Sequence, residues 1–245
     1  MSAPVFFADR AGLVTGERIV LDGAEGRHAA AVRRIGPGES VVLTDGAGLA
    51  VTATVVAAGR DHLVLDVVGR SEQAPPALRI TVVQALPKGD RGELAVETLT
   101  EVGVDRIVPW AAARCVTRWR DERRTKGLER WRSTAREAAK QSRRTWWPAV
   151  DPLASTEAVA DLIGAAAVGL VLHEGAGTPL SVLAVPAVGE VVLVVGPEGG
   201  LTDDELAAFE AVGATSVRLG PTVLRTSTAG TVAAALLLAG SDRWR

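Results

Sequence analysis

The 245-residue sequence predicts an α/β protein with a small β-rich domain over residues 1–72 and a larger α/β domain over residues 73–245. Short β-rich runs separated by turn residues fill the first part of the chain, and a polar stretch containing Pro75 and Pro76 follows them. After that stretch, strand patterns alternate with helix patterns to the end of the chain. Such alternation is typical of a mostly parallel sheet that helices cover on both faces.

The first domain is predicted to be a small barrel or sandwich. Runs rich in β-branched residues are separated by turn signals such as Asp45-Gly46. The predicted strands are residues 18–21, 40–43, 50–56 and 63–68. Between the first two, Ala29, Val32 and Ile35 are apolar positions at helical spacing, and residues 24–35 predict one helix with a basic side.

The second domain begins after a linker, residues 71–76, whose consecutive prolines favour an extended backbone. Buried strands alternate with amphipathic helices beyond it. The predicted strands are residues 80–86, 106–109, 168–172, 191–195 and 216–219. The predicted helices are residues 92–102, 125–141, 203–212 and 228–238.

Composition narrows the functional class. Hydrophobic residues make up 47% and charged residues 23% of the chain, with no apolar run long enough to cross a bilayer, so we expect no membrane association. No signal-peptide pattern begins the chain, and the single Cys115 cannot form an intrachain disulfide, which favours a cytoplasmic location. One cysteine and three histidines predict no metal site.

Charge is distributed unevenly. The net charge is −2, yet residues 114–144 hold twelve basic and four acidic residues, a local charge of +8, so the rest carries −10. One basic region on an acidic protein suits a polyanion that docks in one orientation, although a solvated arginine-rich helix gives the same pattern. Trp119, Trp131, Trp146 and Trp147 lie in or next to this region, either to stack on bases or to pack in the protein.

The strongest local motif is the buried strand 191–195 followed by Gly196-Pro197-Glu198-Gly199-Gly200. Open α/β sheets bind ligands at the carboxyl ends of their strands. The loop lacks the features of a phosphate loop, and its glutamate would repel a pyrophosphate, so a neutral or cationic nucleoside such as S-adenosylmethionine fits better. The alternative is an ordinary turn into a helix, and Thr202 and Glu205 are expected to cap that helix in either case.

Two further strand ends carry polar side chains. Residues 219–229 place Arg225 ahead of a helix of small residues, where its guanidinium is suited to hold an RNA phosphate or an anionic base, or merely to pair with a carboxylate. His173 follows strand 168–172 and by itself is as consistent with a structural role.

These motifs together carry a family resemblance. Gly196-Pro197-Glu198-Gly199-Gly200 and Leu219-Gly220-x-x-Val223-Leu224-Arg225-Thr226-x-Thr228-Ala229 resemble the signature of the RsmE family, the 16S ribosomal RNA uridine-N3 methyltransferases of the SPOUT superfamily. Further blocks are similar over nearly the whole chain, among them Lys88-Gly89-Asp90-Arg91 and Arg130-Trp131. One departure is Ser227, where the family usually has glutamate.

The resemblance implies a PUA-like β-barrel, a SPOUT α/β domain with a trefoil knot, a homodimer, and 16S ribosomal RNA within the small ribosomal subunit as partner. It implies that S-adenosylmethionine, without a metal, is held by Leu172, His173, Glu174, Gly175, Val195, Gly196, Pro197, Glu198, Gly199, Gly200, Leu219, Gly220, Val223, Leu224, Arg225 and Thr228. The expected RNA-binding residues are His28, Arg33, Arg34, Lys88, Arg91, Arg114, Arg130, Arg136 and Arg144.

Methylation at N3 of uridine requires loss of the N3 proton, so a base and an anion stabiliser are needed. Arg225 is the expected catalytic residue as stabiliser, and His173, Glu198 and water are the alternatives for the base. Two other functions stay open: methylation of a ribose 2′-hydroxyl by a related knotted enzyme, and RNA binding without catalysis.

Overall fold

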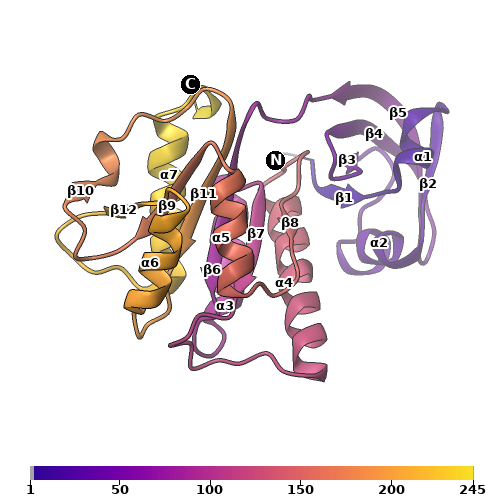
Figure 1. Cartoon of the computed structure of the whole chain (residues 1–245). Helices are drawn as coiled ribbons and strands as arrows, with labels where there is room; N and C mark the ends of the chain where they lie inside the picture. Colours follow the sequence, from indigo (N-terminus) through magenta and orange to yellow (C-terminus); the bar gives the residue numbers. More distant parts are fainter. Residues whose placement is uncertain (1–2, 245) are drawn as a thin grey trace. The chain divides into compact units, whose positions relative to one another are not determined.

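The computed structural model describes residues 3–244, and the chain divides into two compact units (Figure 1). The first unit comprises the chain up to Pro75 together with Ala139–Trp147. The second comprises Pro76–Ala138 and the chain from Pro148 onward. One break between the units lies at the proline pair, and another lies within helix α4 (Glu122–Gln141).

The first unit is built on a curled five-stranded sheet with the order β1-β3-β4-β5-β2. Its strands are β1 (Val5–Phe7), β2 (Arg18–Leu21), β3 (Ser40–Thr44), β4 (Leu49–Ala58) and β5 (Leu63–Glu72). The long β4 and β5 pair antiparallel with two register shifts, and such irregularities increase the local twist that curls a sheet. All four predicted strands are present, whereas the short β1 and helix α1 (Arg10–Val14) carried too little pattern to be predicted.

The helix predicted over residues 24–35 is wrong in extent and type. The structure has a short α2 (Gly23–Arg27) that continues as a π-helical turn, η1 (His28–Val32). Ala29 and Ile35 are buried as the pattern implied, but Val32, the third apolar position, is 66% exposed. The helix stops early because Arg34 adopts a left-handed conformation (φ 55°) just before Gly36 and Pro37.

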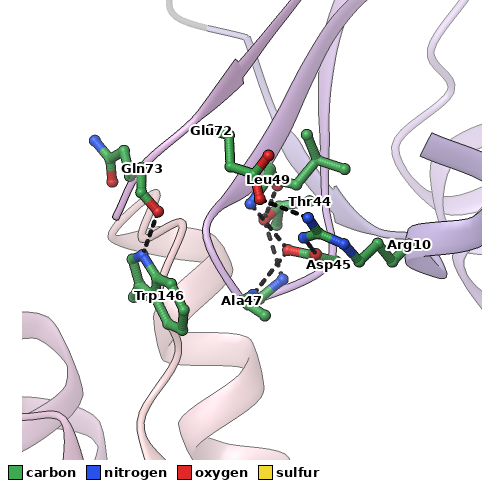
Figure 2. A network of polar contacts seen from close by, with 9 residues as sticks. Arg10, Thr44, Asp45, Ala47, Leu49, Glu72, Gln73 and Trp146 are labelled. Atoms are coloured by element: carbon green, nitrogen blue, oxygen red, sulfur yellow. Dashed lines mark hydrogen bonds and ion pairs between the residues drawn. The ribbon is translucent and has the colours of Figure 1, made fainter. Parts of the chain in front are cut away.

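Residues 139–147 complete the first unit by packing on the turn between β3 and β4. The Trp146 Nε1 donates to the carbonyl of Gln73 at 3.0 Å, as Figure 2 shows, and the Trp147 amide donates to the carbonyl of Gly46 at 2.9 Å. A Cβ on Gly46 would lie 2.8 Å from the Trp147 ring, so only glycine fits there. Hydrogen bonds and packing therefore hold both tryptophans in the first unit.

Asp45 organises the same turn (Figure 2). Its carboxylate accepts hydrogen bonds from the backbone amides of Ala47 and Leu49 and from Arg10 Nη1 at 2.7 Å, and its side chain is only 5% exposed. Burial alone would raise the pKa of Asp45, but the hydrogen bonds from Ala47, Arg10 and Leu49 together lower it below its usual value. The ionised carboxylate is therefore part of the folded turn.

An Asp45→Asn variant is expected to lower the free energy of unfolding of the first unit by about 1–3 kcal/mol, because charge-assisted hydrogen bonds are lost. Since the pKa of Asp45 is lower in the folded state, its contribution is present above the unfolded pKa and lost as the pH falls through the folded value. Thermal unfolding as a function of pH measures both effects. The prediction is contradicted if the variant loses stability toward acid as steeply as the unmodified protein.

The second unit holds a seven-stranded sheet in which every strand pair is parallel (Figure 1). The strand order is β10-β12-β9-β11-β6-β7-β8. The strands are β6 (Leu78–Ala85), β7 (Arg106–Trp110), β8 (Ala149–Val150), β9 (Val168–Leu172), β10 (Thr178–Pro179), β11 (Gly189–Val195) and β12 (Thr215–Arg218). The helices are α3 (Arg91–Val102), α4, α5 (Thr156–Ala165), α6 (Asp203–Ala211) and α7 (Thr226–Ala239).

Helices cover both faces of this sheet. A Cβ on Gly230 of α7 would meet Val195 and Val82, whereas one on Gly169 of β9 would meet Ile163 of α5. Gly169 is paired with Val192, whose side chain points to the face opposite that of Val195 because side chains alternate along a strand. The predicted parallel α/β sheet with helices on both faces is confirmed, while α5, β8 and β10 were missed. The trefoil knot stays a prediction.

No helix within residues 3–244 is long and apolar enough to cross a membrane.

Candidate functional site

A pocket of about 370 Å³ opens at the carboxyl ends of β9, β11 and β12, within the size range of small-molecule sites. Sequence order along the sheet reverses next to this region: β7 and β8 extend to one side of β6, and β9, β11 and β12 lie on the other. Such reversal points are where open α/β sheets bind ligands. The lining residues are Arg91, Leu172, His173, Glu174, Val195, Gly196, Pro197, Glu198, Gly200, Leu201, Val217, Arg218, Leu219, Gly220, Pro221, Thr222, Val223, Leu224, Arg225, Thr226 and Ala229.

Most of the side chains predicted to hold the cofactor line this pocket, but Gly175, Gly199 and Thr228 do not. Gly175 turns back onto the His173 ring, and Gly199 packs on Arg114. The Thr228 hydroxyl donates to the carbonyl of Arg225 at 3.2 Å, which occupies it within the first turn of α7.

Sequence reasoning missed several lining residues. Leu201, Val217 and Arg218 carried no signal because they belong to ordinary strand and loop patterns. Pro221, Thr222, Thr226 and Ala229 stand inside the second motif and were assigned no contact, although their position in the motif was the available signal. Arg91 was expected to bind RNA, and the structure brings it to this pocket.

The glycine-rich loop is held in place by the segment that follows β7. Arg114 Nη1 donates to the carbonyls of Gly199 and Leu201 at 3.3 and 3.0 Å. A Cβ on Gly199 would lie 3.0 Å from the Cβ of Arg114, and Gly200 has φ +73°, a conformation that favours glycine. Arg114, predicted as an RNA contact, therefore also fixes the loop.

Glu205 joins the same two segments. It completes a capping box with Thr202 at the start of α6, which confirms the predicted cap. Its Oε1 also accepts a hydrogen bond from the Ala113 amide at 2.7 Å, and the residue is 4% exposed. This carboxylate therefore connects the end of the glycine-rich loop to the segment after β7.

Glu198 contacts the loop between β6 and α3. Its Oε1 accepts a hydrogen bond from the Lys88 amide at 3.1 Å. This contact ties residues 87–91 to the glycine-rich loop and helps to place Arg91 at the pocket.

Arg225 is the N-cap residue of α7, and its side chain caps no amide of that helix. Within the part of the chain that the structure describes, its exposed guanidinium has no hydrogen-bond or ion-pair partner. Beneath it, the buried Gln84 donates to the carbonyl of Thr226 at 3.4 Å. The helix therefore begins at the pocket with a free cation and the positive end of its dipole.

The pocket residues fit S-adenosylmethionine. Leu172, Val217, Leu219 and Leu224 offer apolar contacts for an adenine ring, and the acidic side chains of Glu174 and Glu198 suit a cationic ligand. A Cβ on Gly220 would meet nothing within 4 Å, so the glycine leaves open space at the pocket. No cluster of potential metal ligands occurs among residues 3–244.

Comparisons with known proteins agree with this geometry. A family model described as an RNA methyltransferase domain matches residues 74–238, and one described as an RNA methyltransferase PUA domain matches residues 21–68. The chain is 48% identical over its whole length to ribosomal RNA small subunit methyltransferase E of Mycobacterium bovis, of which it covers 94%. The chain belongs to the ribosomal RNA small subunit methyltransferase E family.

More distant members of the family also match. The Bacillus subtilis protein is 28% identical, with 85% of each chain covered. The crystal structure of the Neisseria gonorrhoeae protein, bound to S-adenosyl methionine, superposes with a TM-score of 0.85 at 27% identity, covering 97% of this chain and 98% of that one. The PUA-like and SPOUT assignments of the two domains are confirmed.

The residues expected to bind RNA are divided between the units. His28, Arg33, Arg34 and Arg144 belong to the first unit, and the first three are exposed at or just after the π-helical turn. The others belong to the second unit. Lys88 precedes α3 and Arg91 begins it, Arg114 follows β7, and helix α4 carries Arg130 and Arg136.

Trp131 and Cys115 are parts of the core. Trp131 is 2% exposed and meets Trp119 edge-to-face at 5.1 Å, so of the two alternatives it packs in the protein. Burial raises the pKa of the Cys115 thiol, so this residue is poorly suited to act as a nucleophile, in line with the absence of a predicted role.

Proposed function

We propose that this chain transfers the methyl group of S-adenosylmethionine to N3 of one uridine in small-subunit ribosomal RNA. The observation that carries the proposal is the pocket at three strand ends, because both motifs of the family signature line it in a chain that matches the family along its full length. The proposed cofactor contacts are the predicted residues that line this pocket.

S-adenosylmethionine supplies an electrophilic methyl group when bound. Arg225 offers several charged donors to the uracil oxygens, on which negative charge grows as the N3 proton leaves. His173 and Glu198 line the same pocket and are the candidate acceptors of that proton; the carboxylate of Glu198 is oriented by the Lys88 amide. When both reactants are bound in this pocket, their positioning supplies a further part of the acceleration.

We infer a homodimer from exposed apolar side chains on two neighbouring helices. Leu94 of α3 and Val232 and Leu236 of α7 are 44%, 39% and 38% exposed, and Val223 beside the pocket is 80% exposed. A face of this kind on helices that border a binding site suits a second copy of the chain. Sedimentation equilibrium measures the state directly.

We propose that the PUA-like domain and the remaining predicted basic residues contact the RNA. His28, Arg33 and Arg34 lie together on an exposed turn, where positive charge is available to phosphates. Because ribosomal RNA is the proposed substrate, we infer that the reaction takes place where ribosomes are assembled, in the cytoplasm.

The function is tested with methyl-labelled S-adenosylmethionine and small ribosomal subunits from a strain without its own enzyme. After digestion of the RNA, the label is expected in 3-methyluridine at one site. Subunits from the parent strain, already methylated, are the control and should take up no label. Label in a ribose-methylated nucleoside would replace the N3 assignment, and retention of S-adenosylmethionine without transfer to any subunit would argue for a different substrate.

A further inference from the structure

A second hollow lies on the larger unit, with a volume of about 460 Å³. It is bounded by the loop before α3, the segment after Cys115 and the first turns of α4. Four of its lining side chains are basic, Arg118, Arg123, Lys126 and Arg130, and one is acidic, Glu93. We name this hollow the basic groove.

The positive charge of the basic groove is only partly neutralised. The Nη1 of Arg130 lies 3.4 Å from Oε1 of Glu93, and the Nζ of Lys126 lies 3.4 Å from Oε2 of the exposed Glu122. Ion pairs exposed to water in this way contribute little to stability. Arg118 donates to the carbonyls of Ala112 and Ala113, which carry no net charge. The guanidinium of Arg123 has no hydrogen-bond or ion-pair partner among residues 3–244. The groove therefore offers several cations to an anionic ligand.

An apolar wall stands beside these cations. A Cβ on Gly127 would lie 2.5 Å from the Trp119 ring, so the absence of a side chain lets Trp119 lie directly on α4. Val116, which also lines the groove, is 70% exposed. Cations next to an aromatic and aliphatic wall match the phosphates and bases of a single-stranded nucleic acid.

The loop between β6 and α3 contributes to both the basic groove and the pocket at the carboxyl ends of β9, β11 and β12, which we name the methyl-transfer pocket. Pro87, Gly89 and Gly92 line the groove, while Arg91 lines the pocket. The Lys88 amide holds Glu198 of the glycine-rich loop, and the Thr117 hydroxyl donates to the carbonyl of Pro87 at 2.7 Å. A chain lying in the groove is thus held next to the methyl donor.

We propose that the basic groove binds the single-stranded RNA segment adjacent to the target nucleotide, with its phosphates on Arg123, Lys126 and Arg130 and a base against Trp119. The inference rests on the proposed function, since it assigns the substrate side of the same site. Four of the basic residues that make residues 114–144 positively charged line this groove.

The test measures binding of a fluorescein-labelled oligouridylate to the full-length protein by anisotropy at several KCl concentrations. Arg123→Gln and Lys126→Gln are each expected to weaken binding by about fivefold and to reduce the salt slope by about one, as loss of one phosphate contact does. Arg79→Gln is the charge-matched control, because Arg79 stands at the opposite end of β6 and is 59% exposed. It should bind like the unmodified protein.

The proposal is overturned if both groove variants bind the oligouridylate with unchanged affinity and salt slope, or if Arg79→Gln weakens binding equally. The Kd for S-adenosylmethionine, measured by calorimetry, should stay unchanged in all variants. Failure of the proposed function gives a different result. In that case the unmodified protein transfers no label to ribosomal RNA, whether or not the groove variants bind the oligouridylate more weakly.

Discussion

Replacement of Arg225 by glutamine is expected to lower kcat for methyl transfer by about 10²–10³, the usual effect of removing one donor that stabilises transition-state charge. The guanidinium is exposed at the pocket and, among the described residues, bonded to no other group, so it is available to the substrate. Since it carries no structural contact, the fold and the melting temperature should stay as they are. Single-turnover methylation of small ribosomal subunits measures the loss.

The lysine variant separates charge from geometry. Arg225→Lys keeps the positive charge but loses the planar fork of donors, so it should recover only part of the rate. The Kd for S-adenosylmethionine should change by less than about threefold in both variants if the contact is made mainly to the uracil. A fall in cofactor affinity as large as the fall in rate would instead assign Arg225 to the cofactor.

Replacement of Glu205 by alanine is expected to lower the free energy of unfolding by about 3 kcal/mol. The buried carboxylate accepts hydrogen bonds from the amides of Ala113 and Thr202, and its removal leaves these donors without their partner and takes away the reciprocal half of a helix cap. Because the same carboxylate anchors the glycine-rich loop, the affinity for S-adenosylmethionine should fall about tenfold. Chemical denaturation and calorimetry measure the two effects.

Asp204→Ala is the matched control, since it removes an exposed carboxylate from the same helix turn. It should cost less than about 1 kcal/mol, the value of a helix-dipole interaction, and leave cofactor affinity unchanged. Equal losses in the two variants would mean that the charge near the start of α6, and not the link to Ala113, supports the loop.

The alternation of strands and helices could be predicted because each long element carries its own periodicity. Strand β9 was predicted with the bounds that the structure has, and α3, β11 and α6 within two residues. Their apolar residues lie on faces that must be buried, so the pattern is local. Helix α5 was missed although its apolar residues recur at helical spacing, and β8 and β10 were missed because two residues carry no pattern.

The site was predicted in part for the same reason. The motifs at 172–175, 196–200 and 219–225 each follow a strand, and parallel strands bring their carboxyl ends to one edge. The spacing within the motifs also let the family resemblance be recognised. The sequence did not predict the hydrogen bonds that hold the glycine-rich loop. Arg114 donates to the loop carbonyls, Glu198 accepts from the Lys88 amide, and Glu205 accepts from the Ala113 amide. Each bond joins segments that are distant in the sequence.

The sequence by itself determined the fold class, the edge of the sheet at which the pocket opens and the family, because these follow from periodicity and from short contiguous motifs. Only the tertiary structure decided which residues share a cavity. It places Arg91 at the pocket beside the strand ends, leaves Thr228 outside that pocket, and brings Arg118, Arg123 and Lys126 together in the basic groove. Such groupings depend on how loops cross one another in space, and no local pattern of side chains encodes that crossing.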